Sequence, residues 1–239
     1  MREVPVPGGR VVVHGHYGRP VLVFPSEQGN AHDVAGNGLV DAVGGLLEAG
    51  RLKLYCVDSH DAASWSAKHL PLEERARAHE HYEGWILNTV APFVREDCGG
   101  RADIAVAGCS LGAFHAVNVA LRHADVFPLA LGFSGNYDPT SWHGWGEEGM
   151  ALYFANPVRY VPNLHGEHLE WLRRTVSVLL VCGQGQWEDT TGSLDSTRHL
   201  AGLLADKDIP HELDLWGHDV PHDWPSWRRQ WAHHLPRFC

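Results

Sequence analysis

Short apolar runs alternate with longer segments of helical periodicity along most of the chain. The apolar runs are rich in β-branched residues, are mostly continuous, and are bounded by glycine, proline or aspartate. Continuous runs of this kind are typical of strands that are covered on both faces, as in a parallel sheet. The pattern predicts strands at residues 10–14, 20–24, 52–57, 104–107, 129–133, 176–182 and 211–215.

The segments between these runs carry apolar residues three and four positions apart, which is the spacing of a helix with one buried face. The predicted helices cover residues 38–49, 72–96, 111–123, 194–206 and 224–235. Repeated alternation of strand and helix predicts an α/β fold with a mostly parallel, doubly wound sheet.

One stretch interrupts this alternation. Residues 135–174 are rich in proline, glycine and aromatic residues. We interpret them as a small lid-like insertion over one sheet edge, and residues 1–239 as a single domain.

Composition excludes several classes of protein. With 239 residues, of which 44% are apolar, the chain can bury a sizeable core and is not globally disordered. The net charge of −10 argues against nucleic acid as a partner. No apolar run approaches the roughly 18 residues of a membrane span, and MREVPVPGGR at the start lacks the apolar core of a secretory signal. The five cysteines are scattered without a CxxC pair, so we expect a soluble cytoplasmic protein.

The motif that carries chemistry is Gly108-Cys109-Ser110-Leu111-Gly112, which lies between a predicted strand and a predicted helix. GxSxG in this context indicates a nucleophile elbow. The turn is so tight that the positions two before and two after the serine must lack bulk. Ser110 is then expected at a helix N-terminus, where the Leu111 N–H can face a developing oxyanion.

A nucleophilic serine needs a base and an acid, which follow it in the order acid, then histidine, in hydrolases with this elbow. The loop after the last predicted strand offers two histidines, His218 and His222. The loop after the preceding strand offers Glu188 and Asp189 as acids that could orient an imidazole. We favour Glu188 and expect Asp189 to cap the helix that follows.

The second oxyanion donor normally comes from the loop after the strand at 20–24. That loop reads PSEQGN, and a backbone N–H of Ser26 or Glu27 is the expected donor.

These motifs together resemble the putative-esterase group of the α/β-hydrolases, which includes S-formylglutathione hydrolases, feruloyl and enterobactin esterases, and mycolyltransferases. The resemblance is carried by VLVFPS at 21–26, LYCVDS at 54–59, AGCSLGAFHA at 107–116, FSGNYD at 133–138, VCGQGQWED at 181–189 and HDWPSW at 222–227.

The resemblance implies an α/β-hydrolase fold and a serine hydrolase acting on carboxylic esters or thioesters. In these families a His-Asp pair followed by tryptophan holds the catalytic histidine, which selects His222 over His218. The acid lies three residues after a loop glycine in some relatives and four in others, so the family pattern leaves Glu188 and Asp189 both open. An acyltransferase with the same triad, or an inactive binding protein on the same scaffold, are the alternative functions.

Further candidates concern the substrate and metal ions. Trp142, Trp145 and Trp187 are expected to overhang Ser110 as an aromatic pocket, or else to pack the insertion onto the sheet. The His-x-His pairs of the sequence lack an accompanying ligand set such as HExxH, so we expect no metal and no organic cofactor. The expected partner is a small-molecule ester or thioester, and the sequence leaves both a monomer and a homo-oligomer open.

Overall fold

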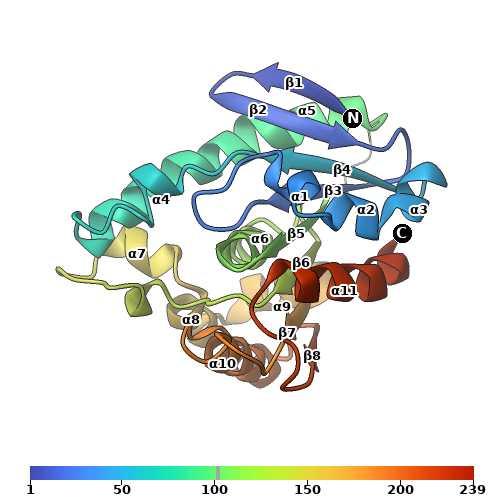
Figure 1. The fold of residues 1–239 in the computed structure, drawn as a ribbon. Helices are drawn as coiled ribbons and strands as arrows, with labels where there is room; N and C mark the ends of the chain where they lie inside the picture. The colour runs from blue at the N-terminus through green and yellow to red at the C-terminus, as the bar shows by residue number, and fades with distance from the viewer. Residues whose placement is uncertain (101–102) are drawn as a thin grey trace.

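Eight strands form one open, mostly parallel sheet in the computed structural model, which describes residues 1–100 and 103–239 (Figure 1). The strand order is β1-β2-β4-β3-β5-β6-β7-β8. The six strands β3 to β8 run parallel to one another. Strand β2 is antiparallel to β4, and β1 is antiparallel to β2. The strands are β1 Arg2–Val6, β2 Gly9–His14, β3 Arg19–Phe24, β4 Leu52–Val57, β5 Ala105–Cys109, β6 Leu129–Phe133, β7 Ser177–Cys182 and β8 His211–Leu215.

The sequence pattern missed the outermost strand, β1. This strand pairs only with β2, and most of its residues are exposed or half-buried. An edge strand with polar residues and Pro5 has no continuous apolar run, which is the signal that predicted the other seven strands.

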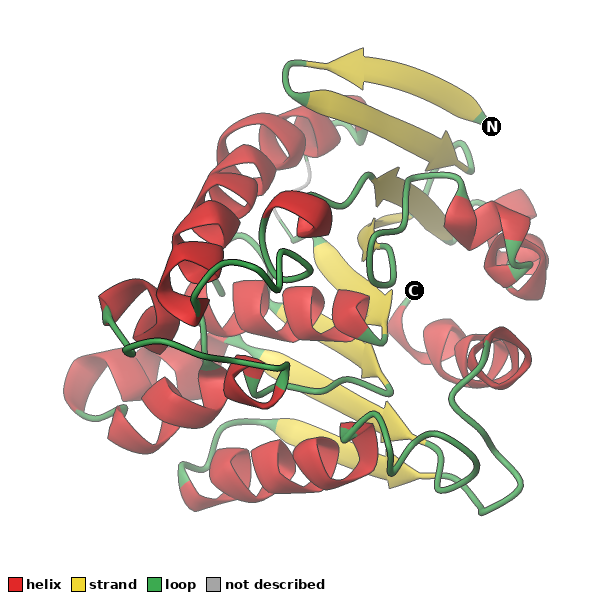
Figure 2. Cartoon of the chain, turned by 60° about the vertical axis from the view of Figure 1, so that its left-hand side comes forward, coloured by secondary structure: helices red, strands yellow, loops and turns green. Residues whose placement is uncertain are grey.

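Helices cover both faces of the sheet (Figure 2). One face carries α4 Leu72–Trp85, α5 Ala91–Asp97, α6 Leu111–Arg122, α7 Met150–Phe154, α8 Pro157–Tyr160, α9 Gly166–Thr175 and α10 Ser193–Asp206. The other face carries α1 Asp33–Gly36, α2 Leu39–Ala42, α3 Gly44–Glu48 and α11 Trp224–His234. A π-helical turn, Ile86–Val90, joins α4 to α5, and short 3₁₀ turns lie at Asp61–Ala63, Pro139–Ser141, Val161–Asn163 and Leu235–Phe238.

Alternate residues of the same strand enter the two cores. Leu22 and Phe24 of β3 pack against the helices of the first face, whereas Val21 and Val23 pack against those of the second. Successive side chains of a strand point to opposite faces, so a strand covered on both faces must be apolar throughout. This is why the central strands read as continuous apolar runs.

Two predicted helices are divided in the structure. The predicted helix 72–96 consists of α4, the π-helical turn and α5. The predicted helix 38–49 is broken into α2 and α3, which meet at Val43 and the Gly44-Gly45 pair. Two consecutive glycines lower helix stability, because they have the most backbone freedom to lose.

The segment 135–174 forms short helices that pack beside the sheet and against α4. Helix α7 is joined to α4 by Glu73, whose carboxylate accepts the backbone N–H groups of Ala151 at 3.3 Å and Leu152 at 3.0 Å. The segment begins just after β6, so its first residues lie at the carboxyl end of that central strand. A lid function for it stays a prediction.

Candidate active site

Ser110 lies in the turn between β5 and α6, with backbone angles of φ 56° and ψ −123°. A non-glycine residue rarely adopts this conformation, so the surrounding structure must hold it. The flanking glycines show how. A Cβ atom on Gly108 would lie 2.2 Å from the Gly112 carbonyl oxygen, and one on Gly112 would lie 2.5 Å from the carbonyl oxygens of Phe24 and Pro25. Strand, turn and helix approach one another here at a distance that only glycine permits.

His222 lies between Ser110 and Glu188. Its Nε2 atom is 3.0 Å from the Ser110 Oγ atom, and its Nδ1 atom is 2.9 Å from a Glu188 carboxylate oxygen. The imidazole packs edge-to-face on Trp227, with ring centroids 5.0 Å apart. Asp223, the next residue, caps α11 by accepting the Ser226 N–H. The helix start and the tryptophan thus fix the orientation of the imidazole.

Glu188 is fully buried, and its carboxylate is surrounded by donors. Besides His222, it accepts the Ser134 hydroxyl at 2.5 Å, the Gly183 N–H at 3.3 Å and the Cys182 thiol at 3.4 Å. Burial, and secondarily the charge of Glu188, raises the pKa of the Cys182 thiol, so this group stays protonated and donates. Two donors thus converge on each oxygen of the Glu188 carboxylate, as the burial of this polar group requires.

Sequence reasoning missed the roles of Ser134 and Trp227 in the site. Ser134 has a φ of 53° and accepts the indole N–H of Trp227 at 3.1 Å while it donates to Glu188. Its place in the FSGNYD motif was the available signal. The contact itself joins residues 54 positions apart and could not be inferred from spacing.

The rival candidates lie away from Ser110. The exposed His218 has its Nδ1 atom 3.1 Å from the Gln184 carbonyl oxygen. Asp189 is also exposed and accepts the N–H of its neighbour Thr190. The expectation that Asp189 caps the following helix is wrong, because α10 begins after Gly192, whose φ of 71° ends the loop in a conformation suited to glycine.

Two residues that were expected to supply oxyanion donors lie beside the same cavity as Ser110. Leu111 is the first residue of α6, and Glu27 lies in the loop after β3; both residues line a cavity of about 280 Å³ beside Ser110. Among the described residues, neither N–H donates to a protein acceptor. Ser26 precedes Glu27, and its carbonyl accepts the Gly29 N–H, which closes the loop into a turn.

The aromatic pocket predicted from the sequence is only partly present. Trp142 lines the cavity and packs against Phe114, at 4.9 Å between ring centroids. Trp145 and Trp187 do not line it and are 52% and 50% exposed. The indole of Trp145 is held outside by a bond to the Lys68 carbonyl, and Trp187 lies in a turn with a φ of 71°.

Polar side chains make up most of the cavity wall instead. The hydroxyl and amide groups come from Asn136, Ser141, Thr190, Thr191 and Ser193, and the charged or titratable ones from Glu27, Lys68 and His143. Arg75, a fully buried residue of α4, holds three of these lining residues together. Its guanidinium donates to the backbone carbonyls of Lys68, Trp142 and His143.

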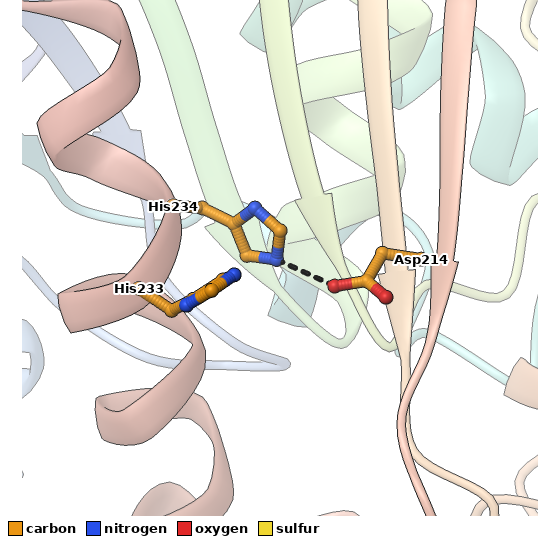
Figure 3. Close-up of side chains that lie close together, drawn as sticks. All are labelled: Asp214, His233 and His234. Atoms are coloured by element: carbon orange, nitrogen blue, oxygen red, sulfur yellow. Dashed lines mark hydrogen bonds and ion pairs between the residues drawn. The ribbon is translucent and has the colours of Figure 1, made fainter.

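A second group of titratable side chains lies far along the chain from Ser110, on β8 and α11. Among the described residues, Asp214, His233 and His234 are the one set whose ligand atoms lie within 4.8 Å of one another. Figure 3 shows His234 and Asp214 pointing toward each other, and the Nε2 atom is 2.9 Å from a carboxylate oxygen. Arg237 donates to Nδ1 at 3.1 Å, so Nε2 carries the proton that is donated to Asp214. A metal ion would have to displace that proton against the nearby guanidinium, so we assign no metal to this group.

Both the sequence and the fold of this chain are similar to those of known proteins. A model of the family described as putative esterase matches residues 57–238. A search of curated protein sequences finds no match. No helix of the described residues is long and apolar enough to cross a membrane.

Several solved structures share the fold. The MPT51 protein of Mycobacterium tuberculosis has a TM-score of 0.73 and 13% sequence identity over 99% of this chain and 96% of its own. An S-formylglutathione hydrolase from Agrobacterium tumefaciens has a TM-score of 0.69 and 16% identity, covering 99% and 97% of the two chains. A ferulic acid esterase has a TM-score of 0.69 and 19% identity, covering 95% and 90%. At these identities the likeness establishes the α/β-hydrolase architecture.

Proposed function

Because this chain belongs to the putative esterase family and is a hydrolase of the carboxylesterase and thioesterase type, we propose that it cleaves its substrates through an acyl-enzyme on Ser110. His222 is the general base, and Glu188 orients it. The observation that carries this proposal is the unbroken contact from the buried Glu188 through His222 to the strained Ser110, with distances of 2.9 Å and 3.0 Å.

The direction of each hydrogen bond supports these roles. Glu188, as the carboxylate, accepts the Nδ1–H of His222, so the Nε2 lone pair faces the Ser110 hydroxyl. His222 takes the Ser110 proton as Oγ attacks the substrate carbonyl. The carboxylate stabilises the imidazolium that forms, and the imidazolium then protonates the leaving alcohol or thiol.

The oxyanion of the tetrahedral intermediate is stabilised by two backbone N–H groups, that of Leu111 and that of Ser26 or Glu27. The cavity position of Leu111 and Glu27 supports this role, and the α6 dipole adds partial positive charge at the same point. In the second half-reaction His222 activates a water molecule, which attacks the acyl-enzyme and releases the acid.

The substrate is a small molecule whose acyl or alcohol group fits a cavity of about 280 Å³ with mainly polar walls. The cavity favours a substrate that offers hydrogen-bonding groups over a long aliphatic chain, which would leave buried wall groups unpaired. A cytoplasmic location stays a prediction, and both a monomer and a homo-oligomer stay open.

Covalent labelling tests the nucleophile. A fluorophosphonate probe should label the wild-type protein at Ser110 and leave Ser110→Ala unlabelled. The same variant should lose p-nitrophenyl acetate hydrolysis by about 10⁴-fold or more, because it removes the attacking atom and leaves only binding and oxyanion stabilisation. Ser110→Ala should fold normally, since it removes one half-buried hydroxyl.

Product analysis separates hydrolysis from acyl transfer. Water as the acceptor gives only the free acid, whereas an acyltransferase gives a new ester when a candidate alcohol is added. Labelling of wild-type protein without turnover of any ester would indicate a scaffold that binds without catalysis, and normal activity of Ser110→Ala would remove Ser110 from the mechanism.

A further inference from the structure

The loop after β4 lies against the loop that carries the proposed oxyanion donors. We call residues 25–31 the oxyanion loop and residues 58–66 the support loop. Four hydrogen bonds join them: Ala31 N–H to Asp58 at 3.1 Å, Ser59 N–H to the Gly29 carbonyl at 3.1 Å, Gln28 N–H to Asp61 at 3.1 Å, and the Ser66 hydroxyl to Glu27 at 2.7 Å. The position of the oxyanion loop therefore depends on the support loop.

Asp61 makes the most unusual of these contacts, because its side chain is fully buried. One carboxylate oxygen accepts the Gln28 N–H, and the other lies 3.0 Å from the Nε2 atom of His115. His115 is itself 2% exposed and belongs to α6, the helix that begins directly after Ser110. A single carboxylate thus connects the nucleophile's helix to the oxyanion loop.

The Gln28 N–H is the contact that matters for geometry. Gln28 has a φ of 55°, a left-handed conformation that is unfavourable for a residue with a side chain. Its N–H belongs to the same rigid peptide plane as the Glu27 carbonyl. Fixing that plane leaves little freedom to the peptide group before it, which carries the N–H of Glu27, a residue that lines the cavity beside Ser110.

A structural role alone does not account for a buried carboxylate at this place. A buried pair of polar groups contributes little net stability, because removing both groups from water offsets the hydrogen bond that they form. The Nδ1 atom of His115 is buried and has no partner among the described residues, which makes the pair still less favourable. What the pair does provide is a connection between α6, which carries His115, and the oxyanion loop, which contains Gln28.

We propose that Asp61 is a positioning residue that sets the oxyanion loop through the Gln28 N–H, and that His115 holds the Asp61 carboxylate in place from the nucleophile's helix. This inference rests on the proposed hydrolase function. It assigns a role to two buried side chains that touch neither the substrate nor the triad.

The test compares Asp61→Ala with Asp58→Ala. Both variants remove one acceptor between the same two loops, but Asp58 holds Ala31, four residues beyond Glu27, and also pairs with Arg10. Asp61→Ala should lower kcat by roughly 10- to 100-fold, because a misaligned donor loses part of the stabilisation that a well-placed one provides. Asp58→Ala should lower Tm and lower kcat by less than about threefold, because Ala31 lies at the far end of the oxyanion loop from the expected donors.

A second readout separates positioning from general damage. A trifluoromethyl ketone forms a hemiketal with the serine that carries an oxyanion, so Asp61→Ala should weaken its inhibition by about the same factor as kcat, with KM changed by less than about threefold. Asp61→Asn, which keeps an oxygen acceptor for the Gln28 N–H, should recover most of the activity. Equal kcat losses in Asp61→Ala and Asp58→Ala, or a loss that appears in KM alone, would overturn the inference.

Asp61→Ala leaves His115 without its partner and could fail to fold. The double variant Asp61→Leu/His115→Leu removes both side chains of the buried pair and fills the space with apolar groups, so that of the partners of Asp61 only the Gln28 N–H loses its acceptor. It should fold and still show the loss of kcat; a folded double variant with wild-type kcat overturns the inference. Failure of the wild-type protein to react with esters or with the ketone would instead count against the proposed function.

Discussion

Two histidine–carboxylate pairs of this chain have the same nitrogen–oxygen distance but differ in the burial of the carboxylate and in the ring nitrogen that it faces. His222 and Glu188 are 2.9 Å apart, as are His234 and Asp214. In the first pair the carboxylate faces Nδ1 and is fully buried; in the second it faces Nε2, and its side chain is 34% exposed. The pair itself therefore does not distinguish a candidate catalytic site from a structural contact.

The third partner makes the difference. The free nitrogen of His222 faces a serine hydroxyl, a group that can give up a proton, whereas that of His234 accepts a bond from the Arg237 guanidinium, which cannot. The hydroxyl also lies on a strained turn at a cavity, and Arg237 instead forms an ion pair with Glu212 at 2.6 Å. Proton transfer is available to one histidine and not to the other.

The largest effect is expected from removing the histidine that faces a hydroxyl. His222→Ala should lower kcat for p-nitrophenyl acetate by about 10⁴-fold or more, because Ser110 then has no base and triad members act as a unit. His218→Ala is the matched control from the same loop and should stay within about twofold of wild type. The reverse ranking would assign the base to His218.

The carboxylate partner should have the next largest effect. Glu188→Gln should lower kcat by about 10² to 10⁴-fold, since the amide can donate to Nδ1 and place the proton on Nε2, the wrong tautomer for a base facing Ser110. Asp189→Asn changes the adjacent, exposed acid and should have little effect. A loss of kcat in Asp189→Asn with normal Glu188→Gln activity would exchange their roles.

The local parts of the site are predictable from sequence, and its long-range contacts are not. GxSxG between an apolar strand and a helix predicts the elbow, because Gly108 is required by the close approach of Gly112 within the same five residues. The approach of Gly112 to Phe24 and Pro25 is one of the long-range contacts. The parallel strands are predictable because burial on both faces makes them continuously apolar. Strand β1 is not, because an exposed edge need not be apolar.

Ser134 and Asp61 show what sequence patterns cannot supply. Each holds a residue of the site across 54 or 33 positions, through a hydroxyl or carboxylate whose neighbours in sequence give no indication of the contact. Trp145 and Trp187 show the opposite error. They were expected to line the cavity or to pack the insertion onto the sheet, but the Trp145 indole is held outside by the Lys68 carbonyl, and Trp187 lies exposed in a turn with a φ of 71°.

A smaller effect, on stability alone, is expected at the second pair. Asp214→Asn weakens the bonds from His234 and from the Trp216 indole and should lower the free energy of unfolding by about 1–2 kcal/mol. Its kcat should equal that of wild type, because neither residue lines the cavity. Urea denaturation and ester hydrolysis measure the two quantities separately. A loss of kcat without a loss of stability would remove the contrast between the pairs.

The smallest effect is a pH dependence that comes from two buried histidines, His79 and His234. His79 is buried among aromatic rings, and neither of its nitrogens has a hydrogen-bond partner among the described residues. Burial, then the charges of His115 and Arg122, lowers the pKa of His79 well below the ordinary 6.5. Burial likewise lowers the pKa of His234, against the opposing charge of Asp214.

The sign follows from proton binding in the two states. Below about pH 6.5 the unfolded chain binds more protons at each of these histidines than the folded chain does, so the free energy of unfolding falls as the pH falls, by at most about 1.4 kcal/mol per pH unit for each histidine. His79→Phe keeps the ring contacts with Trp65 and Phe114 and should reduce this slope, measured by urea denaturation between about pH 7.5 and about pH 5.5. His199→Gln, at an exposed position of α10, is the control and should leave the slope as it is. An unchanged slope in His79→Phe would show that His79 gains its proton without unfolding, and therefore that the enclosed ring is open to water.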